Sequence, residues 1–457
     1  MKNPPPQTAR AAALLALMEV EKGGFPDESL DNIAPHLDRR DRALASALVL
    51  GVLRHKSRLE WTARQFLDKP DKKIKPVLRL ILSLGFFQLW QMSRVPPSAA
   101  VDESVKLAKT YGPPKSSGLI NAVLRNALRA NGLPDPAVAD LPDIEKLALT
   151  ESHPLWLVQR YTDHLGLENT RALLAANNEP PPLTIRANRR RTNRVDLVAL
   201  LTGQGLEVAP TPYAPEGLMI IGPTGPIRDL PGYDDGLFTV QDEASQLAGL
   251  LGHIKPDFRI LDACAGRGGK AMHLAEQTDN KVIGLDPDGR RLTLAEQEAQ
   301  RLGLNNIELI QGDLLKNPPF EEKSFDLVLV DAPCSNLGVI RRRPDVKWSK
   351  TPDDPIRLSE TQKALLTAAG KYVKPEGRLI YSVCTQTPEE TLAVTDDFWM
   401  NHLEFGLKPV AAYLPESARD LADPDGVMRA WPHKHNTDGF FAAIFDRKPT
   451  KPPDFKV

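Results

Sequence analysis

One stretch of the sequence decides the class of fold: ILDACAGRGGK, residues 260–270. Its first residues are apolar and predict a short buried strand, and the glycines after them are typical of a turn in which a ligand approaches the backbone. A helix is expected to begin near Gly269. A strand, a glycine turn and a helix in this order predict a ligand site at the carboxyl end of a parallel strand.

Strands and helices alternate along the chain around this stretch. We predict strands at 259–263, 281–286, 307–311, 325–331 and 378–382, and helices from about residue 269, at 290–302 and at 359–372. Such alternation is typical of an α/β doubly wound, Rossmann-like sheet, whose ligands bind at the carboxyl ends of the strands. The domain is expected to span residues 237–450.

The second predicted strand ends in an acidic residue that suits a nucleoside. Asp286 lies 20 residues after Gly266, the spacing at which a carboxylate accepts hydrogen bonds from ribose hydroxyls. A phosphate-binding P-loop is excluded, because Ala271 stands where that loop needs Ser or Thr. Asp313, after the next strand, is expected beside the adenine, although an acid at such a place is usually a turn or N-cap residue. NAD and S-adenosylmethionine share the ribose, so these motifs leave both cofactors open.

Two of the three cysteines follow strands at this same edge of the sheet. Cys334 comes after the strand at 325–331, and Cys384 comes after the strand at 378–382. A free cysteine is more often a small buried apolar residue than a nucleophile. Two thiols at the cofactor edge favour the other interpretation, a reactive pair, although their positions do not say which thiol is the nucleophile.

A thiol pair beside a nucleoside cofactor suits one reaction well. Addition of a thiolate to C6 of cytosine makes C5 nucleophilic enough to accept a methyl group, and a second thiol serves as the base that removes the C5 proton. Positive charge on N3 favours the addition, and Asp331, at a strand end, is placed to protonate or hydrogen-bond that atom. We therefore expect an S-adenosylmethionine-dependent methyltransferase. A NAD-dependent oxidoreductase explains the glycines and Asp286 but neither cysteine.

The N-terminal part of the chain carries a different pattern. Apolar residues recur at helical spacing between residues 8 and 131, with glycine and proline turns between them, and residues 75–92 are apolar on nearly all sides. This pattern predicts an all-α bundle of about five helices over residues 1–140, with the helix at 75–92 buried inside it.

A small α/β module is predicted between these two domains, at residues 145–236. Short β-like runs at 183–186 and 218–221 flank a helix near 196–203. The module also carries the densest basic cluster of the chain: Arg186, Arg189, Arg190, Arg191 and Arg194. Such a cluster is equally consistent with RNA binding and with a solvated charged loop.

The composition of the chain restricts its location and partners. Its 457 residues have a formal net charge of −1, so RNA binding has to come from local basic patches such as residues 341–348, where three arginines and a lysine precede Trp348. The first residues show no signal peptide and no apolar run is long enough to span a bilayer, which predicts a cytoplasmic protein without membrane contact. The cysteines lack metal-ligand spacing and no coiled-coil heptad is present, so we expect no metal and a monomer.

Over nearly its whole length the chain resembles the Sun/Nop2 family of RNA cytosine-5 methyltransferases, and more closely its bacterial, RsmB-like branch that acts on small-subunit rRNA. The resemblance rests on VQDEAS at 240–245, CAGRGGK at 264–270, DAPCS at 331–335, RRPDVKW at 342–348, CT at 384–385, PEE at 388–390 and DGFF at 438–441. The two cysteine motifs are the most specific of these.

The resemblance implies a set of functional residues. Cys384 forms the covalent adduct, and Cys334 assists its release. S-adenosylmethionine is bound by the loop and by three acidic residues: Cys264, Ala265, Gly266, Arg267, Gly268, Gly269, Lys270, Asp286, Asp313 and Asp331. The N-terminal domain is similar to a NusB-type RNA-binding bundle, with matching pieces at 51–54 and 118–125, and the small module is expected to be RRM-like. The implied substrate is 16S rRNA.

Four residues depart from the family pattern. Arg267 and Ala271 stand where Pro and Thr are usual, Asn336 replaces a glycine, and Thr391 replaces an asparagine. Both thiols are kept, so activity is expected to survive. The remaining alternative is a non-catalytic RNA-binding or antitermination factor with a decayed enzyme domain, which the retention of Asp331 and the two cysteines argues against.

Overall fold

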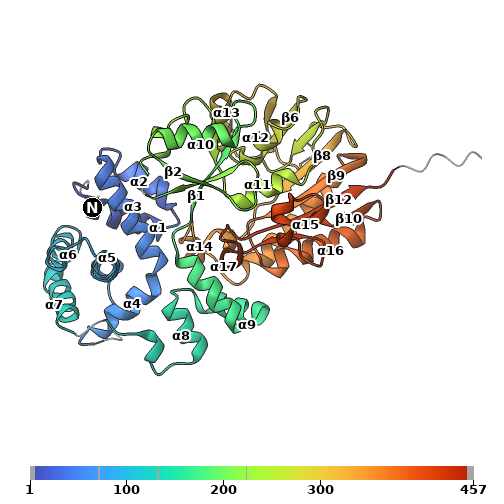
Figure 1. The fold of residues 1–457 in the computed structure, drawn as a ribbon. Helices are drawn as coiled ribbons and strands as arrows, with labels where there is room; N and C mark the ends of the chain where they lie inside the picture. The colour runs from blue at the N-terminus through green and yellow to red at the C-terminus, as the bar shows by residue number, and fades with distance from the viewer. Residues whose placement is uncertain (1–5, 70–72, 131–132, 223, 317, 450–457) are drawn as a thin grey trace, which may run out of the picture. The chain divides into compact units, whose positions relative to one another are not determined.

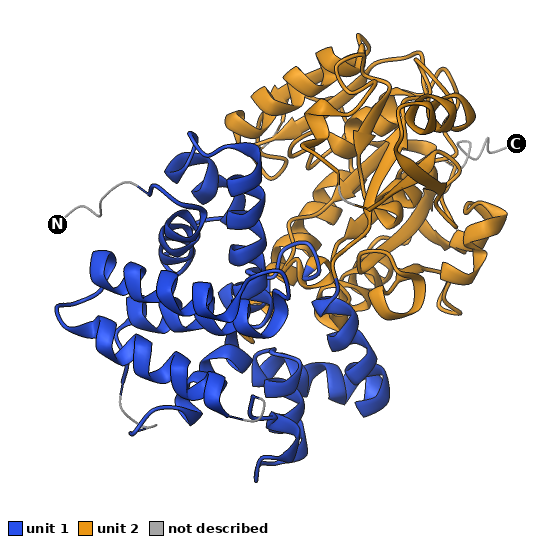
Figure 2. Cartoon of the chain, turned by 60° about the vertical axis from the view of Figure 1, so that its left-hand side comes forward, with its two compact units in different colours: residues 1–179, 340–350 blue, residues 180–339, 351–457 orange. Residues whose placement is uncertain are grey.

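The computed structural model describes residues 6–69, 73–130, 133–222, 224–316 and 318–449. The chain divides into two compact units (Figure 2): residues 1–179 with 340–350, and residues 180–339 with 351–457. Figure 1 labels their helices and strands in chain order. Among the described residues, no helix combines the length and the apolar character that crossing a membrane requires.

The first unit is built of helices, as the sequence predicts for residues 1–140, but it extends to residue 179, into the range that the sequence analysis assigns to the small module. They are α1 (Ala9–Val20), α2 (Pro26–Ile33), α3 (Arg39–Arg54), α4 (Lys56–Gln65), α5 (Pro76–Gln91), α6 (Pro97–Tyr111), α7 (Ser116–Arg129), α8 (Asp143–Thr150), α9 (Leu155–Asn178) and α14 (Val346–Ser349), with the 3-10 turn η1 (Pro136–Val138). The part of the chain described before residue 130 holds seven helices instead of about five. One boundary is hidden in the sequence because α3 and α4 meet at His55, without a glycine or proline between them.

Helix α5 forms the centre of this unit. Pro76 begins it at the first helical position, where proline fits because no N–H is needed there. Its residues Ile81, Leu84 and Phe86 are fully buried. The helix contacts α1, α3, α4, α6 and α7, which confirms the prediction of a buried helix at 75–92.

The segment at 340–350 belongs to this helical unit, although the chain on both sides of it belongs to the second unit. Lys347 is fully buried, and its Nζ donates a hydrogen bond to Arg54 O at 2.8 Å. Trp348 donates from Nε1 to Leu53 O at 2.6 Å. Burial lowers the pKa of Lys347 well below its usual value. The expectation that this segment offers its lysine to RNA is therefore wrong, because Lys347 is buried and held by a carbonyl oxygen at the end of α3; the half-buried ring of Trp348 stays a prediction.

The small module of the second unit is a four-stranded antiparallel sheet with one helix. Its elements are β1 (Leu183–Ala187), α10 (Arg194–Gly203), β2 (Glu207–Pro210), β3 (Gly217–Ile221), η2 (Ile227–Asp229) and β4 (Phe238–Val240). The strand order is β2-β3-β1-β4, and Leu197 and Phe238 are fully buried in its core. The predicted strands and the predicted helix of this module are confirmed.

The arginine cluster of this module makes contacts inside the second unit. Arg186 is fully buried and forms an ion pair with Glu276, next to the end of α12. Arg190 pairs with Asp279 at 2.8 Å. A buried guanidinium needs such acceptors, because an unpaired charge is costly away from water. The RNA-binding interpretation of the cluster is therefore wrong for Arg186, which joins the small sheet to the larger domain.

An eight-stranded mixed sheet dominates the second unit. Its strands are β5 (Ile260–Asp262), β6 (Val282–Asp286), β7 (Ile307–Gln311), β8 (Phe325–Asp331), β9 (Val373–Val383), β10 (Phe405–Lys408), β11 (Met428–Ala430) and β12 (Phe440–Arg447). The order is β10-β12-β9-β8-β5-β6-β7, and β11 pairs with β12. Strands β5 to β9 pair in parallel, as predicted, whereas β10, β11 and β12 pair antiparallel.

Helices cover both faces of this sheet (Figure 1). They are α11 (Glu243–Leu250), α12 (Gly269–Ala275), α13 (Gly289–Leu302), α15 (Asp354–Gly370), α16 (Leu392–Asn401) and α17 (Pro432–His435), with the 3-10 turns η3 (Leu337–Val339), η4 (Pro388–Glu390), η5 (Val410–Ala412) and η6 (Glu416–Leu421). Successive residues of a strand point to opposite faces. Ile260 therefore packs in one core with Leu247 and Leu274, while Leu261 packs in the other with Leu366. The two cores hold the strands in place, so the strand ends form a fixed edge.

Candidate active site

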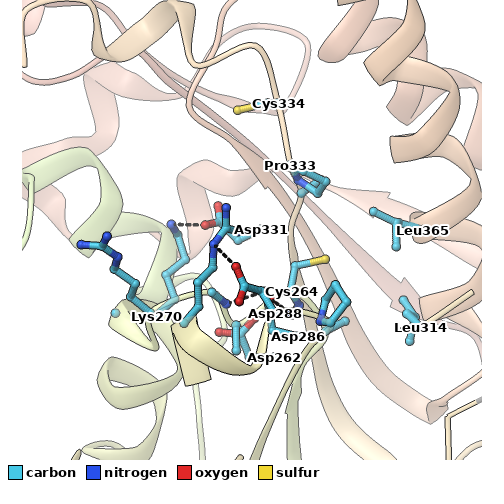
Figure 3. A pocket seen from close by; sticks show the side chains of 18 of the residues that line it. Asp262, Cys264, Lys270, Asp286, Asp288, Leu314, Asp331, Pro333, Cys334 and Leu365 are labelled. Atoms are coloured by element: carbon cyan, nitrogen blue, oxygen red, sulfur yellow. Dashed lines mark hydrogen bonds and ion pairs between the residues drawn. The ribbon is translucent and has the colours of Figure 1, made fainter. Parts of the chain in front are cut away.

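A cavity of about 870 Å³ lies at the carboxyl ends of β5, β6, β8 and β9 (Figure 3). Most of the predicted site residues line it: Cys264, Ala265, Gly266, Arg267, Gly269, Lys270, Asp286, Asp313, Asp331, Cys334 and Cys384. Gly268 is the exception among the predicted residues, because it packs against Met272 and Ala295. The sheet thus brings residues from separate loops into one place.

The glycine turn and the end of β6 form one side of the cavity. Gly266 and Gly268 have φ angles of 56° and 82°, in the left-handed region that glycine adopts without strain. A Cβ on Gly268 would lie 2.7 Å from Met272 Cε and 3.0 Å from Ala295 Cβ, so a larger residue would have to displace these side chains. Gly266 N donates a hydrogen bond to Asp286 Oδ2 at 2.9 Å. This bond holds the turn and the acidic strand end together, as a cradle for a ligand.

Asp262, at the end of β5, is a site residue that the sequence analysis does not single out. Its side chain is buried in the cavity wall, and its Oδ2 has no hydrogen-bond partner among the described residues. Burial, and after it the charge of Asp331, raises the pKa of Asp262 to about 7. An unpartnered buried oxygen at a cavity suits a ligand that donates a hydrogen bond or carries positive charge. Its only signal in the sequence is its place at a strand end.

Lys270 and Asp331 form an ion pair across the cavity (Figure 3). Lys270 Nζ donates to Asp331 Oδ2 at 2.7 Å, and Ser382 Oγ donates to Asp331 Oδ1 at 2.8 Å. Burial acts to lower the pKa of Lys270, but the charge and the hydrogen bond of Asp331 outweigh it, so the pKa stands above its usual value. Both carboxylate oxygens of Asp331 are therefore held in place by hydrogen bonds.

The thiols of Cys334 and Cys384 are in contact, with their sulfur atoms 3.3 Å apart. Cys384 also donates to Asn336 Oδ1 at 2.9 Å, and the same oxygen lies 3.7 Å from the sulfur of Cys334. Cys334 is buried and Cys384 is half-buried. The hydrogen bond to Cys384, then burial, then the charges of Cys384 and Glu390 raise the pKa of Cys334 well above its usual value. The two thiols are therefore unlike, although both line the cavity.

The third cysteine has a different setting. Cys264 lies in the cavity wall, where burial, and after it the charge of Asp262, raises the pKa of its thiol well above the usual value. It is thus held in its neutral form. Within the described ranges, no group of three or more histidine, cysteine, aspartate or glutamate side chains is arranged to hold a metal ion.

Three family models match the chain. The model of the 16S rRNA methyltransferase RsmB/F matches residues 250–446, the NusB family model matches residues 7–129, and a model of the ferredoxin-like domain of RsmF/B-like methyltransferases matches residues 153–227. In chain order they cover the helical region, the small module and the large sheet.

Curated relatives match over most of the chain. A probable ribosomal RNA small subunit methyltransferase B of Bacillus subtilis (strain 168) is 34% identical over 450 residues, which are 96% of this chain and 99% of that protein. The ribosomal RNA small subunit methyltransferase B of Pseudomonas syringae pv. tomato is 36% identical over 397 residues, 86% of each chain. The crystal structure of a methyltransferase homolog from Pyrococcus horikoshii, 26% identical, covers 67% of this chain and 99% of its own with a TM-score of 0.57.

Proposed function

The chain belongs to the RsmB/F family of 16S rRNA methyltransferases, and we propose that it methylates C5 of a cytosine in that RNA through a covalent bond between Cys384 and C6. The contact of two unlike thiols, 3.3 Å apart in one cavity, is the observation that carries this proposal. A methyltransferase acting on a nitrogen or an oxygen atom has no need of a thiol pair, whereas the proposed C5 reaction uses one thiol for attack and the other for release. With ribosomal RNA as its substrate, the enzyme is expected to act in the cytoplasm.

The residues of the cavity fit S-adenosylmethionine, which the family implies as cofactor. Gly266, which has open space where a Cβ would stand, leaves room beside the backbone, and Asp286 would hold the ribose hydroxyls. Asp262, with its unpartnered Oδ2, would face the positively charged part of the cofactor. When bound, the cofactor supplies a methyl group on a sulfonium. Asp313, also in the cavity lining, would lie by the adenine.

The state of the two thiols favours Cys384 as the nucleophile. Cys334 has a raised pKa and stays a thiol near neutral pH, and it is the more buried of the two. Cys384 is half-buried and lines the cavity that the base must enter. As its sulfur bonds to C6, negative charge develops at N3. The Lys270–Asp331 pair, joined by a 2.7 Å hydrogen bond, would supply the proton that N3 requires: the proton of the Lys270 ammonium passes through the Asp331 carboxylate to N3.

The same contact explains how Cys334 changes its role after methyl transfer. Once Cys384 is bound to carbon, its sulfur is a thioether and a poor hydrogen-bond acceptor, so the largest cause of the raised pKa of Cys334, the hydrogen bond to Cys384, is removed. Cys334 then loses its proton to solvent and takes the proton from C5. The electrons of that C–H bond form the C5–C6 double bond, and the Cys384 thiolate leaves.

A pair of single substitutions tests the proposal. Cys334→Ala is expected to accumulate a denaturant-stable complex between protein and rRNA, visible as a retarded band on a gel, while Cys384→Ala forms neither adduct nor product. An adduct with Cys384→Ala and none with Cys334→Ala would show that the two roles are reversed. Bisulfite sequencing of 16S rRNA from cells without the gene is expected to show the loss of one 5-methylcytosine, and an unchanged pattern would refute the cytosine assignment.

A further inference from the structure

Glu390, in η4, is a buried acidic side chain next to the thiols that the mechanism above does not use. It is fully buried. Its carboxylate accepts four hydrogen bonds: from Ser335 N (2.7 Å), Ser335 Oγ (2.5 Å), Thr387 Oγ1 (2.8 Å) and Gln362 Nε2 (3.0 Å). All four donors are neutral groups. A buried carboxylate is stable only where such donors replace water. The four donors are therefore held at the positions from which they reach the Glu390 carboxylate.

The donors belong to the two loops that carry the thiols. Ser335 directly follows Cys334, and its Oγ lies 3.0 Å from Oγ1 of Thr385, which directly follows Cys384. The single hydroxyl proton of Ser335 goes to the carboxylate, so Thr385 donates to Ser335. One chain of hydrogen bonds thus runs from Glu390 through Ser335 to the loop of Cys384.

The backbone before each thiol is held by the same group. Gln362, on α15, donates to Pro333 O at 3.0 Å as well as to Glu390. Tyr381, on β9, donates from its hydroxyl to the carbonyl oxygen of Glu390 at 2.7 Å. Glu390 is therefore linked by hydrogen bonds to residues before and after each cysteine, in both loops.

We propose that Glu390 is a positioning residue that holds the two thiols in contact and so sets the rates of attack and release. It acts through Ser335 and Thr385 and does not touch the substrate. The inference rests on the proposed function, because it assumes that both thiols take part. A carboxylate with only a structural role would lower the stability of the protein when replaced but leave the thiol pair reactive.

Two measurements separate these roles. The first is kcat and KM for rRNA methylation, and the second is capture of the free full-length protein by phenylarsine oxide, which binds two thiols at one arsenic atom and releases water. Capture requires two adjacent thiols but neither RNA nor cofactor, so it tests the position of the thiols independently of the reaction. The variants are Glu390→Gln, which keeps the size, and Glu390→Asp, which keeps the charge.

Glu390→Gln presents an amide nitrogen to donors that require an acceptor, and we expect kcat to fall by roughly 10- to 100-fold, with little change in KM for S-adenosylmethionine and slower arsenical capture. Glu390→Asp is expected to recover part of kcat and part of the rate of arsenical capture. Ser335→Ala removes only the link to Thr385 and should show the same effects more weakly, which provides a second test if Glu390→Gln folds poorly.

Glu243→Gln is the matched control, since Glu243 is another buried carboxylate of the second unit that accepts hydrogen bonds from Tyr213 N and Ala214 N, at 2.5 and 2.7 Å. It is expected to lose stability without any change in arsenical capture. If phenylarsine oxide captures Glu390→Gln and Ser335→Ala at the wild-type rate, the inference is overturned. If wild-type protein makes a methylated base other than 5-methylcytosine, the proposed function fails, and the capture rates still decide whether Glu390 positions the thiols.

Discussion

The ion pair of Lys270 and Asp331 allows a sharp prediction about catalysis. Lys270→Met keeps the length and the apolar stem of the side chain but removes the charge and the hydrogen bond to Asp331, which is 2.7 Å long. Of the two hydrogen bonds to Asp331 described above, the one from Ser382 remains, and in the proposed mechanism N3 of the cytosine loses its source of a proton. We expect kcat to fall and the affinity for S-adenosylmethionine to change less, because Asp262, Asp286 and the glycine turn remain.

The size of the effect follows from burial of the pair. The side chain of Lys270 is 11% exposed and that of Asp331 is 32% exposed, so water hydrates the remaining carboxylate in part. A hydrogen bond to a charged group in such a setting contributes about 1.5–3 kcal/mol. Since each ~1.4 kcal/mol is tenfold in rate, we expect kcat/KM to fall by roughly 10- to 100-fold.

The assay is single-turnover methylation of 16S rRNA with labelled S-adenosylmethionine, beside calorimetric titration of the cofactor. Lys281→Met is the control, because Lys281 forms a lysine–glutamate pair of similar length, 2.8 Å to Glu308, with side chains 60% and 45% exposed. Exposed pairs contribute about 0–1 kcal/mol, so this variant should keep its activity. Unchanged kcat with a large loss of cofactor affinity in Lys270→Met would assign Lys270 to cofactor binding. Wild-type values of both would refute the catalytic role of the pair.

Three further substitutions test other parts of the structure. Burial and nearby cations lower the pKa of His55 to about 3, below the unfolded value of about 6.5. The free energy of unfolding of the helical unit should therefore fall by up to ~1.4 kcal/mol per pH unit as the pH falls from 6.5 to 3. His55→Gln should flatten this slope, measured by urea unfolding at several pH values. Glu276→Gln removes the negative charge that pairs with the buried guanidinium of Arg186 and should lower the free energy of unfolding by about 3–5 kcal/mol. Gly268→Ala places a Cβ 2.7 Å from Met272 Cε at a φ of 82° and should weaken S-adenosylmethionine binding about tenfold, measured by calorimetry.

Each of these has an outcome that contradicts it. An equal pH slope in wild type and His55→Gln would mean that other groups carry the acid sensitivity of the helical unit. If Glu276→Gln unfolds like wild type, the guanidinium finds another acceptor and the ion pair does not hold the small sheet. Wild-type affinity in Gly268→Ala would show that the turn relaxes without disturbing the cavity.

Several features of this protein follow from the sequence by itself. The parallel strands β5 to β9, the glycine turn and the acidic end of β6 are predicted because apolar runs, glycines and strand ends are local signals. The place of Cys334 and Cys384 at one edge also follows, since the carboxyl ends of parallel strands meet there. With the resemblance to a known family, these features pointed to most of the predicted residues that line the cavity, although not to Asp262.

Only the tertiary structure decided which side chains meet. It buried Lys347 and Arg186, which the sequence offers to RNA, and it gave them partners far away along the chain, at Arg54 and Glu276. It also tied the two cysteine loops to Glu390, a residue that the sequence shows only as part of a short motif. The physical reason is that a hydrogen-bond partner is chosen by distance and burial in space, which the periodicity of the sequence does not encode, whereas the strands that bring the partners together are encoded locally.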